Sequence, residues 1–337
     1  MLPHIDASGA GSFRGVSRTK VLSIVGPGRS GTTILTSVLG QTEGFLNVGE
    51  LRWLWRRGLL EGRACGCGAP SLQACPLWSR VIEKVSAGRV ATDLAAEIGG
   101  ALEELAWRRH RLRVIREATA GSSQWPALEQ VRQVSEGLIS AIAEVTGARV
   151  VVDSSKRAQD AAVIAGLDEV EHYVLHMVRD PAAVIHSWQR RDKTTHAADG
   201  ARTMATRGFL PSMVRWSENC LGAEALHQRM PGGRWMFVRY EDFAAAPRAT
   251  VARILSFLGE DVPPPFVDED TVVLDVNHTV AGNPNRFRVG PVQVRADDEW
   301  RRRMPHRQQL AVRALSWPLL LRYGYSLDTR SVVGARA

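Results

Sequence analysis

The chain has 337 residues, of which 45% are hydrophobic, which is enough to bury a sizeable core. Its 43 basic and 35 acidic residues give a formal net charge of +8, which favours anionic ligands but is no argument for nucleic acid. No apolar run approaches the roughly 18 residues of a membrane helix, and the first residues lack the apolar core of a signal peptide. We therefore expect a cytoplasmic globular protein without a membrane span, and no pattern indicates its oligomeric state.

Short apolar runs alternate with helical patterns along the chain. The runs lie at 20–25, 148–153, 172–178 and 234–240. This alternation predicts an α/β fold whose parallel sheet is covered by helices on both faces. Residues 50–147 show helical periodicity, and we expect them to form a helical insertion between the first and second strands, as a lid or a substrate wall.

The boundaries follow from where these patterns begin and end. We expect a flexible segment at 1–19, a single domain over 20–325 and a tail at 326–337. A glycine- and asparagine-rich loop at about 277–291 interrupts the C-terminal part, and loops of this length are often functional.

The first run leads into "GPGRSGTTIL", at 26–35. A strand that turns through glycines into a helix presents free backbone N–H groups and the positive end of the helix dipole, which together bind anions. Gly26 and Gly31 have the spacing of a nucleotide triphosphate loop, but Thr32 stands where that loop needs lysine. The candidate ligands of the anion are Gly28, Arg29, Ser30, Gly31, Thr32 and Thr33.

A second motif, "VLHMVRDPAAVIHSW", lies at 174–188. Arg179 at the end of a strand and Ser187 on the next helix have a spacing that lets them converge on one phosphate, and Arg191 lies one helical turn beyond Ser187. A structural interpretation of the same segment is that Asp180 caps the helix and Pro181 takes its first position. Both interpretations can hold together.

These two motifs resemble the 5′-phosphosulfate loop and the 3′-phosphate motif of sulfotransferases that use 3′-phosphoadenosine 5′-phosphosulfate (PAPS). The arginine form of the loop is similar to that of bacterial and tyrosylprotein sulfotransferases. The resemblance covers about 20–325 and implies a P-loop-like fold. It also implies in-line transfer of a sulfuryl group from PAPS to a hydroxyl of an intracellular acceptor, with no metal required.

The resemblance assigns three catalytic residues. Glu50 matches the glutamate that serves as base, although a carboxylate in the first turn of a helix is also favoured by the dipole. Lys156, in "DSSK", is similar to the lysine at the bridging oxygen, and Arg29 would join it there. His278 is an alternative base. Asp153 would orient Lys156, or hold magnesium if the chain were an NTPase.

The C-terminal loop resembles the family's cofactor loop less closely, because its sequence "HTVAGNPNRFRVG" differs from the usual R-K-G form. Its counterparts there are Asn283 and Arg286 as hydrogen-bond donors to the cofactor. Tyr240 matches a motif near the cofactor, and its ring fits the core equally well.

Three of the four cysteines cluster in "CGCGAPSLQAC", at Cys65, Cys67 and Cys75. No fourth ligand lies nearby in the sequence and no C-x-x-C pair is present. We therefore expect a packed glycine turn, with a metal site or a disulfide as the alternatives.

Two other functions compete with sulfuryl transfer. One is a P-loop kinase or NTPase, and the other is a non-catalytic protein that binds polyanions through its basic surface. For the sulfotransferase, the expected acceptor is a small molecule, a lipid or a carbohydrate.

Overall fold

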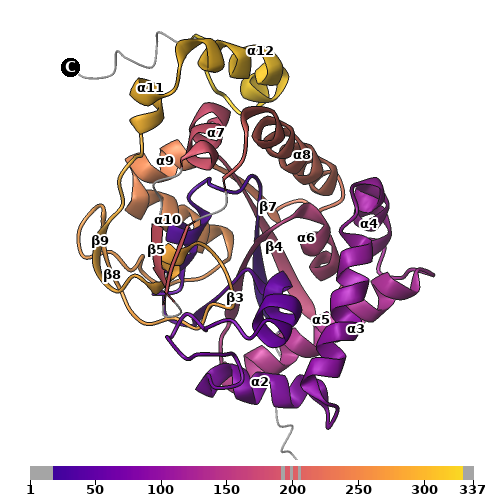
Figure 1. Ribbon diagram of the computed structural model, residues 1–337. Coiled ribbons are helices and arrows are strands. Elements are labelled where there is room, and N and C mark those ends of the chain that lie inside the picture. Colours follow the sequence, from indigo (N-terminus) through magenta and orange to yellow (C-terminus); the bar gives the residue numbers. More distant parts are fainter. Residues whose placement is uncertain (1–17, 191–193, 198–199, 204–205, 329–337) are drawn as a thin grey trace, which may run out of the picture.

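A five-stranded parallel sheet forms the centre of the computed structural model, which describes residues 18–190, 194–197, 200–203 and 206–328 (Figure 1). The strand order is β2-β3-β1-β4-β7, and every neighbouring pair is parallel. The strands are β1 (Thr19–Val25), β2 (Phe45–Gly49), β3 (Val150–Lys156), β4 (Val170–Val178) and β7 (Trp235–Arg239). The α/β class with a parallel sheet is thereby confirmed.

Helices follow each central strand, as βαβ connections require. The α-helices are α1 (Thr32–Leu39), α2 (Pro76–Ser86), α3 (Ala91–Leu105), α4 (Arg111–Ala118), α5 (Pro126–Thr146), α6 (Ala158–Ala165), α7 (Pro181–Gln189), α8 (Phe209–His227), α9 (Tyr240–Ala245), α10 (Pro247–Phe257), α11 (Glu299–Arg303) and α12 (His306–Arg322). A π-helix, η2 (Leu54–Leu60), and three 3₁₀-helices, η1 (Leu51–Trp53), η3 (Arg108–His110) and η4 (Pro284–Phe287), complete the helical elements. Among the described residues, no helix combines the length and the apolar character needed to cross a membrane.

Two short antiparallel pairs lie outside the central sheet. One joins β5 (Thr194–Ala197) to β6 (Gly200–Thr203), and the other joins β8 (Thr271–Leu274) to β9 (Gly290–Gln293). The second pair brackets most of the glycine- and asparagine-rich loop and therefore fixes both of its ends.

Successive side chains of β1 point to opposite faces of the sheet, and the core forms one apolar layer on each face. Leu22 and Ile24 pack with α1 and α10 on one face of the sheet. Val21 and Val25 face the other side, where they pack with the insertion and with α6 and α8. In Figure 1, the insertion helix α2 lies at the bottom of the molecule and α11 and α12 lie at the top.

One strand of the sheet was missed by the sequence analysis. β2 covers five residues and contains Asn47 and Gly49, which are poor strand formers, so its pattern is weak. It pairs with β3 at the edge of the sheet. The insertion therefore follows β2 directly, and Glu50 lies at the carboxyl end of a strand.

The loop after β1 packs so closely against its neighbours that Gly26 and Gly31 cannot carry a side chain. Both have positive φ, at 130° and 80°. A Cβ on Gly26 would lie 2.2 Å from the carbonyl oxygen of Met177, and one on Gly31 would lie 2.4 Å from the ring of Tyr240. The loop is thus held against β4 and Tyr240 at positions where only glycine fits.

We expect Gly31→Ala to destabilise the fold by about 1–3 kcal/mol, because the new methyl group overlaps Tyr240 and the left-handed backbone disfavours alanine. Gly137→Ala is the matched control, since Gly137 lies within α5 and a Cβ there meets nothing within 4 Å. That control should gain up to about 1 kcal/mol. Urea unfolding measures both, and a Gly31→Ala midpoint at or above that of the parent would contradict the packing described.

Candidate active site

The glycine loop after β1 is flanked by the ends of the two neighbouring strands. The Gly26 N–H donates to the carbonyl oxygen of Lys156 at 3.0 Å, on the β3 side. Arg179 Nη1 donates to the carbonyl oxygen of Arg29 at 3.3 Å, on the β4 side. The carboxyl ends of three adjacent parallel strands therefore form one edge, which is where open α/β sheets bind their ligands.

Arg29 and Arg179 bring two positive charges together at this edge. Burial and the charge of Arg179 lower the pKa of Arg29 from its ordinary value. The Arg29 guanidinium lies 4.8 Å from the centre of the Trp188 ring, and the Arg179 guanidinium lies 4.3 Å from that of Tyr240. Two like charges held close by aromatic rings favour an anion beside them.

Backbone strain is concentrated at the same place. Three non-glycine residues in the described part of the chain have positive φ, and two of them are Arg29 (73°) and Lys156 (70°). Such conformations cost of the order of 1–3 kcal/mol each and occur preferentially where a side chain must be aimed at a ligand. The third, Ala87, lies at the end of α2.

Arg179 is held from a second direction by a segment that the sequence analysis missed. Its Nη2 donates to the carbonyl oxygen of Asp297 at 2.7 Å and lies 3.3 Å from the Asp297 carboxylate. The Tyr240 hydroxyl accepts from the Asp297 N–H and donates to the carbonyl oxygen of Arg295. Tyr240 thus packs against the Arg179 guanidinium and also holds the segment that contains Asp297. No local sequence signal marks Asp297.

The helix after Arg179 has the predicted N-terminus. The Asp180 carboxylate accepts from the N–H of Ala182 at 2.8 Å, and Pro181 is the first residue of α7. Ser187 is buried in the last turn of this helix. Arg191 lies outside the described residues, so its place beside Ser187 stays a prediction.

Glu50 and Lys156 form an ion pair next to the glycine loop. Lys156 Nζ lies 2.6 Å from Glu50 Oε1, and Trp53 Nε1 donates to Glu50 Oε2 at 3.0 Å. Burial alone would raise the pKa of Glu50, but the charge and hydrogen bond of Lys156 and the hydrogen bond of Trp53 outweigh it and hold that pKa below its usual value. The carboxylate is therefore ionised at neutral pH. It is not used to cap η1.

Asp153 positions the segment that carries Glu50. Its Oδ1 accepts from the N–H of Leu51 at 3.1 Å and from the hydroxyl of Ser155 at 2.7 Å. Lys156 bonds instead to Glu50 and to the carbonyl oxygen of Ser154. Among the described residues, Asp153 thus bonds to Leu51, the residue after Glu50, and not to Lys156 as expected.

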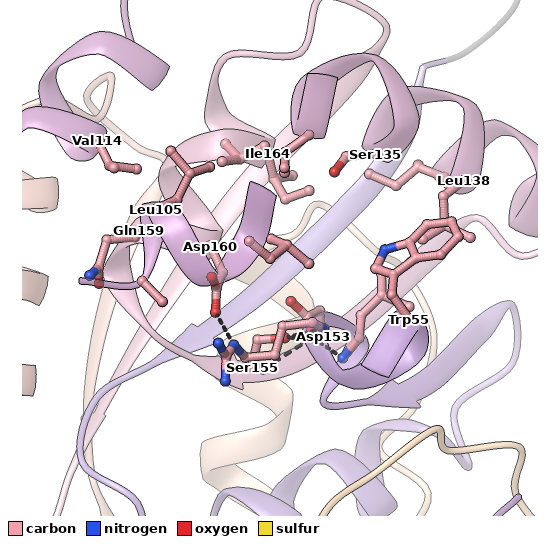
Figure 2. Close-up of a pocket in the computed structure, with 17 residues that line it drawn as sticks. Trp55, Leu105, Val114, Ser135, Leu138, Asp153, Ser155, Gln159, Asp160 and Ile164 are labelled. Carbon is pink, nitrogen blue, oxygen red and sulfur yellow. Dashed lines mark hydrogen bonds and ion pairs between the residues drawn. The ribbon is translucent and has the colours of Figure 1, made fainter. Parts of the chain in front are cut away.

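The insertion and the sheet enclose a largely apolar cavity behind this segment (Figure 2). Leu105, Leu138 and Ile164 line it, and Asp153 and Ser155 form its polar floor. Its volume of about 60 Å³ is well below the roughly 150 Å³ of an engineered apolar cavity that binds benzene. Residues of the insertion line this cavity, which is too small for an acceptor of that size, so a role of the insertion as a substrate wall stays a prediction.

The C-terminal loop contacts the Glu50 segment through its backbone. The Glu50 N–H donates to the carbonyl oxygen of Ala281 at 3.1 Å, and the Val280 N–H donates to that of Val48 at 2.9 Å. The Asn283 side chain accepts from the N–H of Asn285 and begins η4. A contact of Asn283 with the cofactor stays a prediction.

Arg286 of the same loop is buried and bonds to backbone. Its guanidinium donates to the carbonyl oxygens of Thr279 and Ala64. The bond to Ala64 ties the loop to the insertion. The predicted hydrogen bond from Arg286 to the cofactor is untested, and the geometry gives this residue a structural role.

The cysteine motif also meets this loop. Cys65, Cys67 and Cys75 converge on His278, whose Nδ1 lies 3.2 Å from Cys75 Sγ. His278, the alternative base, therefore contacts sulfur. A fourth side chain with a possible ligand atom, which the sequence lacked nearby, is thus supplied by a residue more than 200 positions away in the chain.

The burial of Asp153 leads to a pH-dependent stability. Burial raises the pKa of Asp153 to about 6. An unfolded aspartate titrates near pH 3.9, so between these values the folded state binds more protons and stability falls as the pH rises. Asp153→Asn keeps an acceptor oxygen for Leu51 but does not titrate. The stability of the parent minus that of the variant should fall by roughly 2 kcal/mol from pH 4.5 to 7, as measured by urea unfolding. A constant difference across this range would exclude the raised pKa.

Several bacterial sulfotransferase structures are similar to this chain. A sulfotransferase domain from the curacin biosynthetic pathway is 14% identical, with 92% of this chain and 99% of that one covered and a TM-score of 0.49. The sulfotransferase domain of the Synechococcus PCC 7002 olefin synthase is 18% identical, with 92% and 96% covered and a TM-score of 0.46. The sulfotransferase STF9 of Mycobacterium avium is 13% identical, with 93% and 79% covered and a TM-score of 0.45. No curated protein sequence matches.

The family model gives the decisive comparison. The model of the Sulfotransferase family matches residues 22–264, a range that contains the glycine loop, Glu50, Lys156 and the Arg179 motif. This match covers well over half of the chain, and the chain therefore belongs to the sulfotransferase family.

Proposed function

We propose that this protein transfers the sulfuryl group of PAPS to a hydroxyl group of an acceptor by in-line displacement. The observation that carries this proposal is the pairing of the glycine loop with Arg179 on one side and with the Glu50–Lys156 ion pair on the other. One edge of the sheet would thereby offer an anion site, a base and a cation side by side.

The residues of the loop fit a phosphosulfate group. Ser30 Oγ and Arg179 Nε are buried and have no hydrogen-bond partner within the part of the chain that the structure describes. Buried polar atoms of this kind are costly unless a ligand satisfies them. The N–H groups at the start of α1 and the charge of Arg29 would add to them at the 5′ end of the cofactor.

Arg179 would bind the 3′-phosphate together with Ser187 and Arg191. Its guanidinium points toward the glycine loop, since it bonds to the carbonyl oxygen of Arg29. This contact supports two adjoining phosphate sites, which one bisphosphorylated adenosine would need for its two phosphates. In this structure Arg179 pairs with Asp297, and this ion pair would have to loosen for Arg179 to bind the phosphate.

Glu50 would take the proton of the acceptor hydroxyl while the acceptor oxygen bonds to sulfur and the bond from sulfur to the bridging oxygen breaks. A neutral Glu50 holds Lys156 less strongly. The ammonium group, with Arg29, is then available to the charge that develops on the bridging oxygen. The ion pair therefore couples proton removal to stabilisation of the leaving phosphate.

A kinase or NTPase is the weaker alternative for this geometry. Such an enzyme needs a loop lysine at the β- and γ-phosphates and an acidic residue for magnesium. Thr32 occupies the lysine position, and Asp153 is bonded to Leu51 and Ser155 behind the site. A carboxylate engaged in this way does not face the loop as a magnesium ligand would.

Calorimetry with adenosine 3′,5′-bisphosphate tests the cofactor site. We expect binding that is unchanged by magnesium and that weakens at least about 30-fold in Arg179→Ala, because about 2 kcal/mol or more is lost with a buried charge partner. Arg234→Ala is the control, since Arg234 precedes β7 at the opposite end of the sheet and pairs with Glu171. Equal affinity in the parent and Arg179→Ala would remove the 3′-phosphate assignment, and a magnesium requirement would favour the NTPase.

Replacement of Glu50 tests the base. Glu50→Gln should keep the affinity for adenosine 3′,5′-bisphosphate and lose about 10²–10⁴-fold in turnover, the usual contribution of a general base. Turnover is followed as release of this bisphosphate from PAPS with simple phenols and alcohols as acceptors. Glu61→Gln is the control, because Glu61 pairs with Arg56 and Arg63 on the surface. Retained turnover in Glu50→Gln would eliminate Glu50 as the base.

A further inference from the structure

Four side chains with metal-binding atoms converge at a point that the proposed reaction does not use. Cys65, Cys67 and Cys75 come from the start of the insertion, and His278 comes from the loop after β8. Their sulfur and nitrogen atoms all lie within 4.8 Å of one another. Cys65 and Cys75 are fully buried, and the other two are partly exposed.

Two of the six ligand separations lie close to the edges of a tetrahedron around zinc. With Zn–S near 2.3 Å and Zn–N near 2.0–2.1 Å, ideal geometry places two sulfurs about 3.8 Å apart and sulfur and nitrogen about 3.5 Å apart. Cys67 Sγ and Cys75 Sγ are 3.8 Å apart, and Cys75 Sγ is 3.2 Å from His278 Nδ1. Three thiols and one imidazole form a closed ligand set typical of structural zinc.

A disulfide accounts for less of this arrangement. It would join two sulfurs at about 2.05 Å and leave the third cysteine and the histidine without a purpose. It would also not explain why a histidine more than 200 residues distant is directed at the sulfurs. The convergence of all four groups favours a metal.

The backbone around the four ligands is built to bring them together. A Cβ on Gly66 would lie 2.3 Å from Asn277 Oδ1, so only glycine fits between the first two cysteines. The Gly66 N–H donates to the carbonyl oxygen of Thr279 at 3.0 Å, and Trp78 Nε1 donates to that of His278 at 2.5 Å. Arg286 bonds to Ala64 and Thr279, the residues next to two of the ligands.

We propose that Cys65, Cys67, Cys75 and His278 bind a structural zinc ion that fastens the C-terminal loop to the insertion. The loop in turn accepts the N–H of Glu50 through the carbonyl oxygen of Ala281. The zinc ion would thus support the segment that carries Glu50 without contacting the reacting atoms. This site is independent of the sulfuryl transfer proposed above, because its occupancy is measured without any substrate.

The test is the metal content of the full chain, purified under reducing conditions without chelators. Inductively coupled plasma mass spectrometry of the purified protein should give one zinc ion per chain. Replacement of zinc by cobalt(II) should give the visible d–d bands of a tetrahedral site and thiolate-to-cobalt charge-transfer bands in the near ultraviolet. A strong chelator should lower the thermal unfolding midpoint, since structural zinc contributes directly to folding.

Variants separate the site from adventitious binding. Cys67→Ser and His278→Asn should each weaken zinc binding at least tenfold, whereas Cys220→Ala should keep one zinc, because Cys220 lies in the core around α8. The cobalt spectrum of the parent tests the proposal even if a variant does not fold. Metal-free parent protein after reconstitution with zinc chloride, a non-tetrahedral cobalt spectrum, an unchanged zinc affinity of both variants in competition with a chromophoric chelator, or a Cys67–Cys75 disulfide in the freshly purified chain would each overturn it.

Discussion

The parallel pairing of β3, β1 and β4 is the constraint on which the site depends. Because the three strands run in the same direction and are neighbours, their carboxyl ends reach one edge of the sheet together. The hydrogen bond from Gly26 to Lys156 extends the β1–β3 contact by one residue into the loop. Arg179 then reaches back to the loop from the other side. Cations that are distant in the sequence are thereby gathered around one glycine turn.

This gathering has an energetic cost that the fold offsets elsewhere. Arg29 and Lys156 adopt strained backbone conformations, and Arg29 and Arg179 repel each other. The surrounding apolar layers are well packed on both faces of the sheet and supply the compensating stability. Natural sequences depart from local preference mainly where function requires it, and the departures here coincide with the candidate site.

The sequence predicted the parts of the structure that are encoded locally. The β1 loop, the Asp180 cap and the strands of the central sheet other than β2 follow from glycine spacing, capping chemistry and apolar runs, and the structure contains them all. The short edge strand β2 was not predicted, because its five residues carry little strand pattern. The contacts of Asp297 with Arg179 and of His278 with the cysteines were also not predicted. They join residues that only tertiary packing brings together, so no spacing in the sequence reports them.

The attachment of the C-terminal loop to the insertion affects the order in which the enzyme can be completed during its synthesis. Glu50 emerges from the ribosome more than 200 residues before Ala281 and Arg286, whose carbonyl and guanidinium groups secure its surroundings. Domains fold as their chains become available. The glycine loop and Glu50 are therefore synthesised long before the contacts that secure the Glu50 segment can form.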